Sequence, residues 1–175
     1  MRKKFETSKP GGATDSAERI QEFRDKLCKY LPNLKAKIDE TPAEKLKPMI
    51  PFVIDRIQLY GDVAEFGYLF ESPDYKSEKS IKSLNKVKPG SEEARKVLRD
   101  LYESFEKVPE NEYHEATILK ICGEYLYANK KTLKNEDVYH LLRYILSGTH
   151  AGGPVGKMIE ILGKDEVRKR IRPWL

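Results

Sequence analysis

The sequence contains few residues of the kinds that bind metal ions. Of its 175 residues only two are cysteines and three are histidines. Cys28 and Cys122 are far apart, and neither has a second cysteine or a histidine at the spacing of zinc ligands. We therefore expect no metal site, and two buried free thiols in a reducing compartment.

Long hydrophobic runs are also missing. No apolar segment approaches the roughly 18 residues that a membrane-spanning helix needs. The residues after Met1 do not form the apolar core of a signal peptide. We expect a soluble protein that is not secreted and has no membrane partner.

The sequence shows no sustained alternation of apolar and polar residues, so strands are not expected. Apolar residues recur instead at spacings of three and four, which predicts amphipathic helices. One such stripe consists of Ala94, Val97, Leu98, Leu101 and Phe105. The predicted fold class is all-α.

Composition divides the chain into three parts. Residues 1–13 combine glycines, a proline and mixed charges without any period, which indicates a disordered leader or a cloning junction. The segment KVKPGS, residues 86–91, is typical of a linker. We predict a first helical subdomain at 14–86 and a second at 87–175.

Prolines and glycines predict several helix ends. Pro48 and Pro51 are compatible only with the first turn of a helix, because proline lacks the amide that an inner turn uses. The helical pattern resumes from Val63 to Phe70. Pro154 is expected to open a helix, and Gly163 to close it.

Motifs for catalysis are absent. His114, His140 and His150 lie in separate predicted elements, and none is near a serine or cysteine in a nucleophile motif. The sequence has no phosphate-binding loop of the GxxxxGK[ST] type and no GxGxxG after a strand. We predict no catalytic residue. His140 is expected to be exposed, and His150 is a possible ligand contact.

Charge is only weakly informative. Lys and Arg number 33 against 28 Asp and Glu, which gives a formal charge of +5 and a pI near 9.0. This balance is compatible with a polyanionic partner, but no arginine-rich tract points to a phosphate-binding tail.

The stretch LLRYILSGTHAGGPVGKMIEILG, residues 141–163, is the most distinctive. Arg143 is predicted to project from the last turns of one helix, where a cation also favours the helix dipole. The next helix starts at Pro154, which leaves its first amides free for phosphate or base acceptors. Glycines at 152, 153 and 156 would let a planar group approach the backbone. A pocket for an unstacked base and a tight helix–helix turn both fit this pattern.

Two blocks of sequence together resemble the C-terminal anticodon-binding domain of class I glutamyl-tRNA synthetases of the bacterial and organellar type. One is LRYILSG, then GGP, then EILGKDEVRKRI. The other is LPNLKAKID followed by VIDRIQLYGDVAEFGYLFESPDY. The resemblance spans residues 27–172. It implies an all-α helical cage that binds the anticodon loop of tRNA(Glu), or also of tRNA(Gln) if the protein does not discriminate.

The resemblance also assigns residues to anticodon bases. Arg143 matches the family arginine that contacts the first base, and Gly153, Pro154 and Gly156 match loop positions around that base. Arg56 matches, within one residue, the arginine that reads the third base in discriminating members. A surface ion pair of Arg56 with an adjacent aspartate, Asp55 or Asp62, is the alternative. The loop THAGGP is one residue longer than the common family form.

Basic residues at the end of the chain are predicted to bind RNA phosphates. They are Lys157, Lys164, Arg168 and Lys169. The ATP-binding motifs of the family's catalytic domain, His-x-Gly-His and Lys-Met-Ser-Lys, are absent. We therefore expect this chain to be inactive alone, to hold no cofactor, and to partner a catalytic domain that binds ATP and Mg²⁺. DNA is not an expected partner.

Two other functions remain open. A helical protein-interaction scaffold could present Tyr60, Tyr68 and Tyr144 as an exposed surface. A stand-alone tRNA-binding factor is the other alternative. The resemblance fits either bacterial cytoplasm or mitochondrial matrix, and the basic pI favours the matrix.

Overall fold

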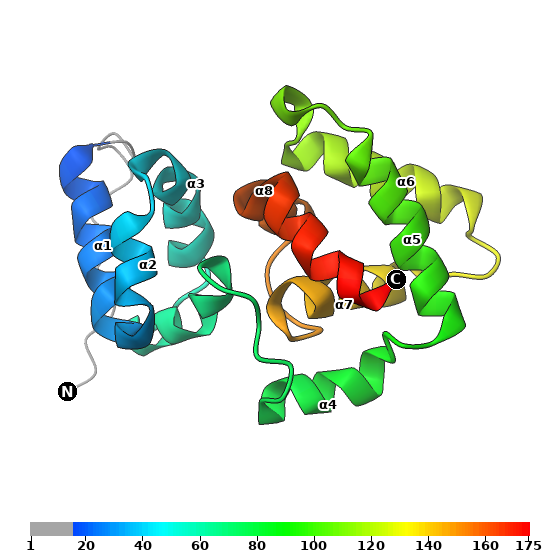
Figure 1. The fold of residues 1–175 in the computed structure, drawn as a ribbon, viewed down its shortest axis with the longest axis horizontal. Helices are drawn as coiled ribbons and strands as arrows, with labels where there is room; N and C mark the ends of the chain where they lie inside the picture. The colour runs from blue at the N-terminus through cyan, green and yellow to red at the C-terminus, as the bar shows by residue number, and fades with distance from the viewer. Residues whose placement is uncertain (1–15) are drawn as a thin grey trace. The chain divides into compact units, whose positions relative to one another are not determined.

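The computed structural model describes residues 16–175, so the predicted leader at 1–13 lies outside the described residues. Within that range every regular element is a helix and none is a strand, which confirms the all-α prediction (Figure 1). No helix in the described part of the chain is long and apolar enough to cross a membrane.

The residues form two units, one ending at Glu71 and one running from Ser72 to Leu175. The predicted boundary at 86/87 differs, because the helix before it belongs to the second unit. Tyr75 donates a hydrogen bond to the carbonyl of Ile145 over 2.6 Å, which fastens this segment to the second unit. The segment at 86–91 is the turn between two helices of one unit.

Over its described residues, 16–71, the first unit is built from three α-helices and two 3-10 segments. The α-helices are α1 (Ala17–Tyr30), α2 (Lys35–Glu40) and α3 (Ala43–Ile54). The 3-10 segments are Pro32–Leu34 and Tyr60–Leu69. Helix α1 contacts α2, α3 and the second 3-10 segment, and its buried residues Ile20, Phe23 and Leu27 form its share of the core.

Helix α3 starts earlier than predicted, at Ala43, so Pro48 and Pro51 both lie inside it. Each proline removes one intrahelical hydrogen bond and costs about 3 kcal/mol in an isolated helix. Pro51 is exposed, and the apolar face opposite it is fully buried, with Leu46, Ile50 and Val53 at 0% exposure. Burial of that face outweighs the local preference.

The prediction of an α-helix from Val63 to Phe70 is wrong, because the chain forms 3-10 turns over Tyr60–Leu69. The carboxylate of Asp62 accepts hydrogen bonds from the amides of Gln58 and Leu59, each at 2.9 Å. These bonds lower the pKa of Asp62. They fix a tight turn just before the apolar pattern resumes, and side chains of that pattern still reach the core.

The second unit contains five α-helices: α4 (Glu78–Val87), α5 (Glu92–Glu106), α6 (Glu115–Ala128), α7 (Asn135–Ser147) and α8 (Val155–Ile171). Short 3-10 segments lie at Glu110–Glu112 and Arg172–Trp174. Helix α8 contacts α5, α6 and α7, whereas α4 contacts α7 (Figure 1). The loop between α7 and α8 therefore lies near α4.

Gly163, predicted to close the helix that Pro154 opens, ends only its first segment, and α8 continues to Ile171. The backbone angles of Gly163 are φ 76° and ψ 163°, which are not helical, so α8 consists of two helical segments joined at this glycine. The second segment ends in the basic run Arg168, Lys169 and Arg170, where cations favour the helix dipole.

The two cysteines differ in environment. Cys122 is buried, and burial raises the pKa of its thiol to about 12. Cys28 is only half-buried, and its Sγ lies 3.4 Å from a carboxylate oxygen of Asp39. The prediction of two buried thiols is thus confirmed for Cys122 and wrong for Cys28.

Candidate nucleic-acid interface

The loop between α7 and α8, residues 148–154, is held against α4. Gly148 ends α7 with φ 79°, a left-handed conformation that favours glycine. Its carbonyl accepts a hydrogen bond from Ser80 Oγ over 2.7 Å. A Cβ at Gly148 would lie 2.7 Å from the Oγ of Ser80. Only glycine therefore allows α4 to pack this closely against the end of α7.

Arg143 and Gly153 come together as predicted. The Nε of Arg143 donates a hydrogen bond to the Gly153 carbonyl over 3.0 Å, and the side chain is half-buried along the loop. One guanidinium donor is thus used to position the loop, and the two terminal nitrogens remain to bind a ligand. The helix and the loop hold this arginine in one orientation.

The start of α8 carries no side-chain cap. Pro154 is the N-cap, and the first intrahelical bond joins the Met158 amide to the Pro154 carbonyl over 3.0 Å. The partial positive charge of the helix dipole is therefore directed at the loop that Arg143 holds. Gly152 and Pro154 are exposed at this end, whereas Gly153 is buried.

Gly156 has a different role from the one predicted. It is buried, and a Cβ there would lie 2.8 Å from Cγ of Leu119 and 3.1 Å from Cγ of Glu115, both on α6. This glycine allows α6 and α8 to pack closely, so its missing side chain is explained without a ligand.

A second group of polar side chains lies beside the same loop. Nδ1 of His150 is 3.0 Å from Ser83 Oγ, and its Nε2 is 3.2 Å from Lys86 Nζ. The His140 ring contacts the His150 ring edge-on, with centroids 5.4 Å apart. The expectation of an exposed His140 is wrong, because its side chain is only 19% exposed.

This group was missed in part by sequence reasoning. Ser80, Ser83 and Lys86 come from α4, for which we predicted no role. Buried serines have no periodic signal of their own, and only the N-cap Ser77, whose side chain accepts from the Ser80 amide, marks the helix start in the sequence.

Arg56, in the first unit, is exposed, and its guanidinium stacks on the ring of Phe52. Its guanidinium carbon lies 4.4 Å from the centroid of the Phe52 ring, and its Nη1 donates to the Phe52 carbonyl over 2.6 Å. In the described part of the chain no ion pair joins Arg56 to Asp55 or Asp62. The alternative of a surface ion pair is therefore not supported, and the exposed guanidinium is accessible to a ligand.

Of the four predicted phosphate-binding residues, Lys157 and Lys169 pair with carboxylates on their own helix. Lys157 Nζ lies 2.5 Å from Glu160, which also accepts a 2.7 Å hydrogen bond from the Glu115 amide. Burial acts to raise the pKa of Glu160, but these two donors outweigh it and the pKa is lowered. Lys169 lies 3.6 Å from Glu166 and its side chain is 69% exposed.

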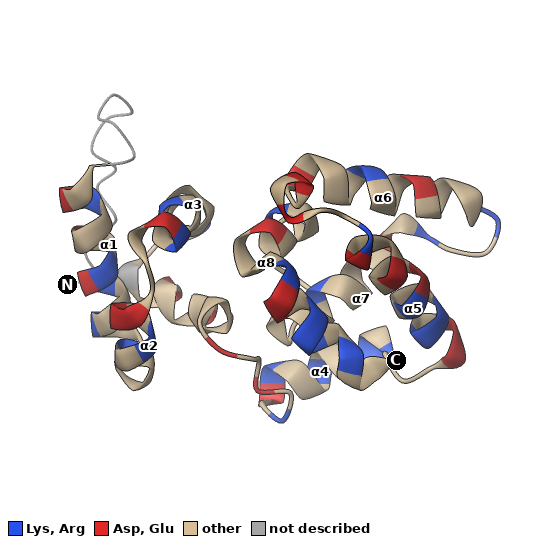
Figure 2. Cartoon of the chain, turned by 45° about the horizontal axis from the view of Figure 1, so that its top comes forward, with Lys and Arg blue, Asp and Glu red and all other residues tan. Residues whose placement is uncertain are grey.

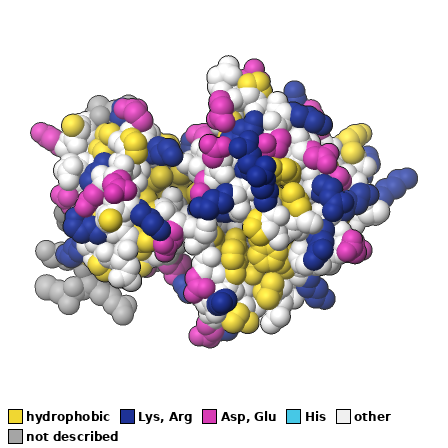
Figure 3. Space-filling view, in the orientation of Figure 1, with side chains coloured by type: hydrophobic (Ala, Val, Ile, Leu, Met, Phe, Trp, Pro, Cys, Tyr) yellow, Lys and Arg dark blue, Asp and Glu magenta, His cyan; other side chains and the backbone are white. Residues whose placement is uncertain are grey.

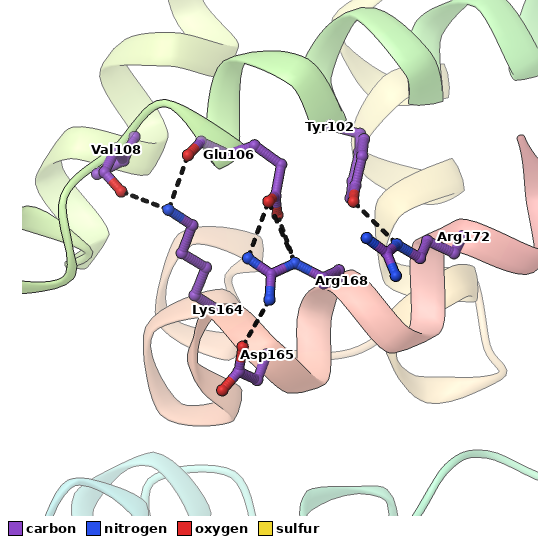
Figure 4. A network of polar contacts seen from close by, with 7 residues as sticks. All are labelled: Tyr102, Glu106, Val108, Lys164, Asp165, Arg168 and Arg172. Carbon is purple, nitrogen blue, oxygen red and sulfur yellow. Dashed lines mark hydrogen bonds and ion pairs between the residues drawn. The ribbon is translucent and has the colours of Figure 1, made fainter.

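The other two, Lys164 and Arg168, point into a network with α5 (Figure 4). Lys164 Nζ donates to the carbonyls of Glu106 and Val108 over 2.8 and 2.7 Å. Arg168 binds the Glu106 carboxylate through Nε and Nη2, and Asp165 through Nη1. The bonds to Glu106, and then the nearby Asp165, raise the pKa of Arg168. The bonds from Lys164 satisfy carbonyls at and just after the end of α5.

Basic side chains are unevenly distributed on the second unit. Figure 2 shows them along the part of α8 nearest the C-terminus, and Figure 3 shows Lys and Arg gathered over α8 beside hydrophobic side chains. Because Lys164 and Arg168 are engaged with α5, Lys169 is the member of the predicted phosphate set most available to solvent.

Of the three tyrosines predicted for a protein-interaction surface, Tyr68 and Tyr144 are not exposed, and the side chain of Tyr60 lies outside what the structure describes. Tyr144 is completely buried, and its ring contacts those of Tyr75 and Trp174. The Tyr68 side chain is half-buried and lies beside Phe66. The expectation of an exposed Tyr144 is wrong, because the apolar stripe of α7 is wide enough to include it.

An all-α unit that holds an arginine and an uncapped helix start on one loop is suited to bind single-stranded nucleic acid. The chain belongs to the anticodon binding domain family, whose model matches residues 16–175. No curated protein matches the chain.

Two solved structures share the fold. One is a glutamate tRNA ligase from Elizabethkingia meningosepticum, with a TM-score of 0.63 and 24% identity over 91% of this chain. The other is the glutamate-tRNA synthetase from Elizabethkingia anophelis, with a TM-score of 0.57 and 22% identity, also over 91%. The chain spans 32% and 31% of their lengths, so it corresponds to about a third of each.

Proposed function

We propose that this chain binds the anticodon loop of tRNA(Glu) as the C-terminal domain of a glutamyl-tRNA synthetase and so supports aminoacylation in translation. The observation that carries the proposal is the hydrogen bond from Arg143 to Gly153 at the uncapped start of α8. It fixes an arginine beside a loop in a chain whose family is defined by anticodon binding.

In this proposal the bases are read by two arginines on separate units. Arg143 contacts the first anticodon base with its terminal nitrogens, supported by the backbone of Gly153 and Pro154. Arg56 reads the third base, and its stacking on Phe52 limits the conformations it must lose on binding. If Arg56 rejects the third base of glutamine tRNAs, the enzyme is specific for tRNA(Glu).

The remaining components belong to the rest of the enzyme. We propose that ATP and Mg²⁺ are bound by a catalytic domain with which this chain is associated, and that the protein acts in the compartment where translation occurs. Bacterial cytoplasm and mitochondrial matrix both satisfy this, and the pI near 9.0 favours the matrix.

Equilibrium titration of the chain with the anticodon stem-loop of a glutamate tRNA tests the function. A stem-loop with the same stem and an unrelated loop is the control. We expect both RNAs to bind with an affinity that falls as salt increases, because phosphate contacts are common to them. The cognate loop should bind more tightly. Absence of salt-dependent binding to either RNA would instead support the protein scaffold.

A further inference from the structure

Four basic side chains converge beside the loop between α7 and α8. Lys86 comes from α4, His140 and Arg143 from α7, and His150 from the loop itself. His150 contacts Lys86 through Nε2 and His140 through its ring. Arg143 lies close enough to affect the electrostatics of His150. A cluster of basic groups raises the local positive potential, which attracts an anion.

The His150 ring is held by a buried residue. Ser83 is 3% exposed; its Oγ lies 3.0 Å from His150 Nδ1 and accepts the His150 amide over 3.3 Å. An ammonium group can only donate, so Lys86 makes Nε2 an acceptor and places the ring proton on Nδ1. The ring is therefore neutral, fixed by Ser83, with its Nε2 directed at Lys86.

Negative charge is scarce around this ring. Three basic groups face it: Lys86 from α4, and His140 and Arg143 from α7. Among the described residues, no carboxylate contributes to the pKa shift of His150. Glu136 lies 3.8 Å from Nε2 of His140, the other ring of the pair. Burial, and then these basic neighbours, with Lys86 first among them, lower the pKa of His150. An anion placed between Lys86 and His150 would reverse that balance.

We propose that one phosphodiester of the bound RNA docks between Lys86 and His150, and that His150 takes up a proton from solvent as it docks. The hydrogen bond from Lys86 to Nε2 is exchanged for two charge-assisted bonds, one from Lys86 and one from protonated Nε2, to phosphate oxygens. Nδ1 continues to donate to Ser83. The inference rests on the proposed function, because the RNA must reach the loop held by Arg143.

The test is calorimetric titration of the full chain with the glutamate anticodon stem-loop, in buffers of different ionisation enthalpy and at several pH values. Proton uptake on binding should be largest near about pH 6.5, between the lowered pKa of His150 in the free chain and its raised pKa beside a phosphate. Affinity should be about tenfold greater at about pH 5.5 than at about pH 8. His150→Gln, which can still bond Ser83, should lose most of the uptake, and Lys86→Ala should weaken binding about tenfold.

Two matched controls accompany these variants. His114→Gln changes the one histidine outside the group, and Lys130→Ala changes an exposed lysine after α6. Both should retain the pH dependence. RNA binding with no proton uptake, or with uptake unchanged in His150→Gln, overturns the inference and leaves the proposed function standing. Inorganic phosphate that elicits the same uptake as RNA would show a general anion site and overturn the assignment to the RNA backbone. Absence of RNA binding at every pH overturns both.

Discussion

At the scale of single residues, the basic side chains of α8 differ in what already binds them. Lys164 donates to the carbonyl at the end of α5 and to one in the connection after it. Within residues 16–175, Lys169 pairs only with Glu166 of its own helix, at 3.6 Å. A phosphate that bound Lys164 would have to break bonds that hold α8 on α5. A phosphate at Lys169 would replace one weak, exposed ion pair.

This difference makes a prediction for two lysine variants. Lys169→Ala should lower the slope of log affinity against log salt by about 0.7 to 1, because one phosphate contact is lost, and should leave thermal stability unchanged. Lys164→Ala should lower the thermal stability and leave the slope nearly unchanged. Salt-dependent titrations and thermal melts measure both. Equal effects of the two substitutions on the slope would show that the network in Figure 4 opens when RNA binds.

The residue scale also shows how far sequence reasoning reached. The proximity of Arg143 to Gly153 could be anticipated, because Arg143 lies near the end of α7 and Gly153 in the short loop that follows it. The packing role of Gly156 could not be anticipated, because it depends on Leu119 of α6. No local pattern in the sequence indicates that α6 approaches this position. Likewise Ser83 and Lys86 lie more than sixty positions before the loop that they contact.

At the scale of elements, the contact between α6 and α8 requires a missing side chain. Gly156→Ala should destabilise the fold by about 1–3 kcal/mol, because the added methyl group overpacks against Leu119. The higher helix propensity of alanine offsets part of this loss. Gly123→Ala is a matched control on α6, because a Cβ there would meet nothing within 4 Å. It should stabilise the protein by about 0.5–1 kcal/mol.

Chemical denaturation of the two alanine variants measures these differences. Adding Leu119→Ala to Gly156→Ala should recover part of the lost stability, because it removes the clashing atoms. A Gly156→Ala protein as stable as the parent would mean that α8 can shift away from α6 without cost.

Element types were predictable where packing and local preference agree, as in α5 and α7. They were less so in the first unit. The inner prolines of α3 contradict a helix locally, and the segment after Gly61 has a helical pattern but forms 3-10 turns fixed by Asp62. In both places tertiary burial or a side-chain hydrogen bond decides the outcome, and neither is visible in periodicity.

At the scale of the whole molecule, the second unit should be the one that is sensitive to alkali. Burial raises the pKa of Tyr75 and of Tyr125 to about 12, and also raises that of Tyr113. A phenol whose pKa is higher folded than unfolded contributes stability that is present below about pH 10 and lost as pH rises toward 12. The folded unit should therefore weaken across this range.

Circular dichroism and phenolate absorbance, followed together against pH, test this prediction. Helix loss and phenolate appearance should coincide. Tyr75→Phe should reduce stability at neutral pH, since it loses the bond to the Ile145 carbonyl, but should flatten the alkaline decline. Ionisation of all tyrosines at their ordinary pKa, with no loss of helix, would contradict the account.

The central claim is that Arg143 reads the first anticodon base from its place beside Gly153. The most direct measurement is a set of titrations in which the chain and its Arg143→Ala variant bind glutamate stem-loops that carry each of the four bases at that position. Arg95→Ala, an exposed arginine on α5, is the control. We predict that the parent and the control prefer the cognate base by about 1–3 kcal/mol and that Arg143→Ala loses the preference. An unchanged preference in Arg143→Ala would contradict the claim.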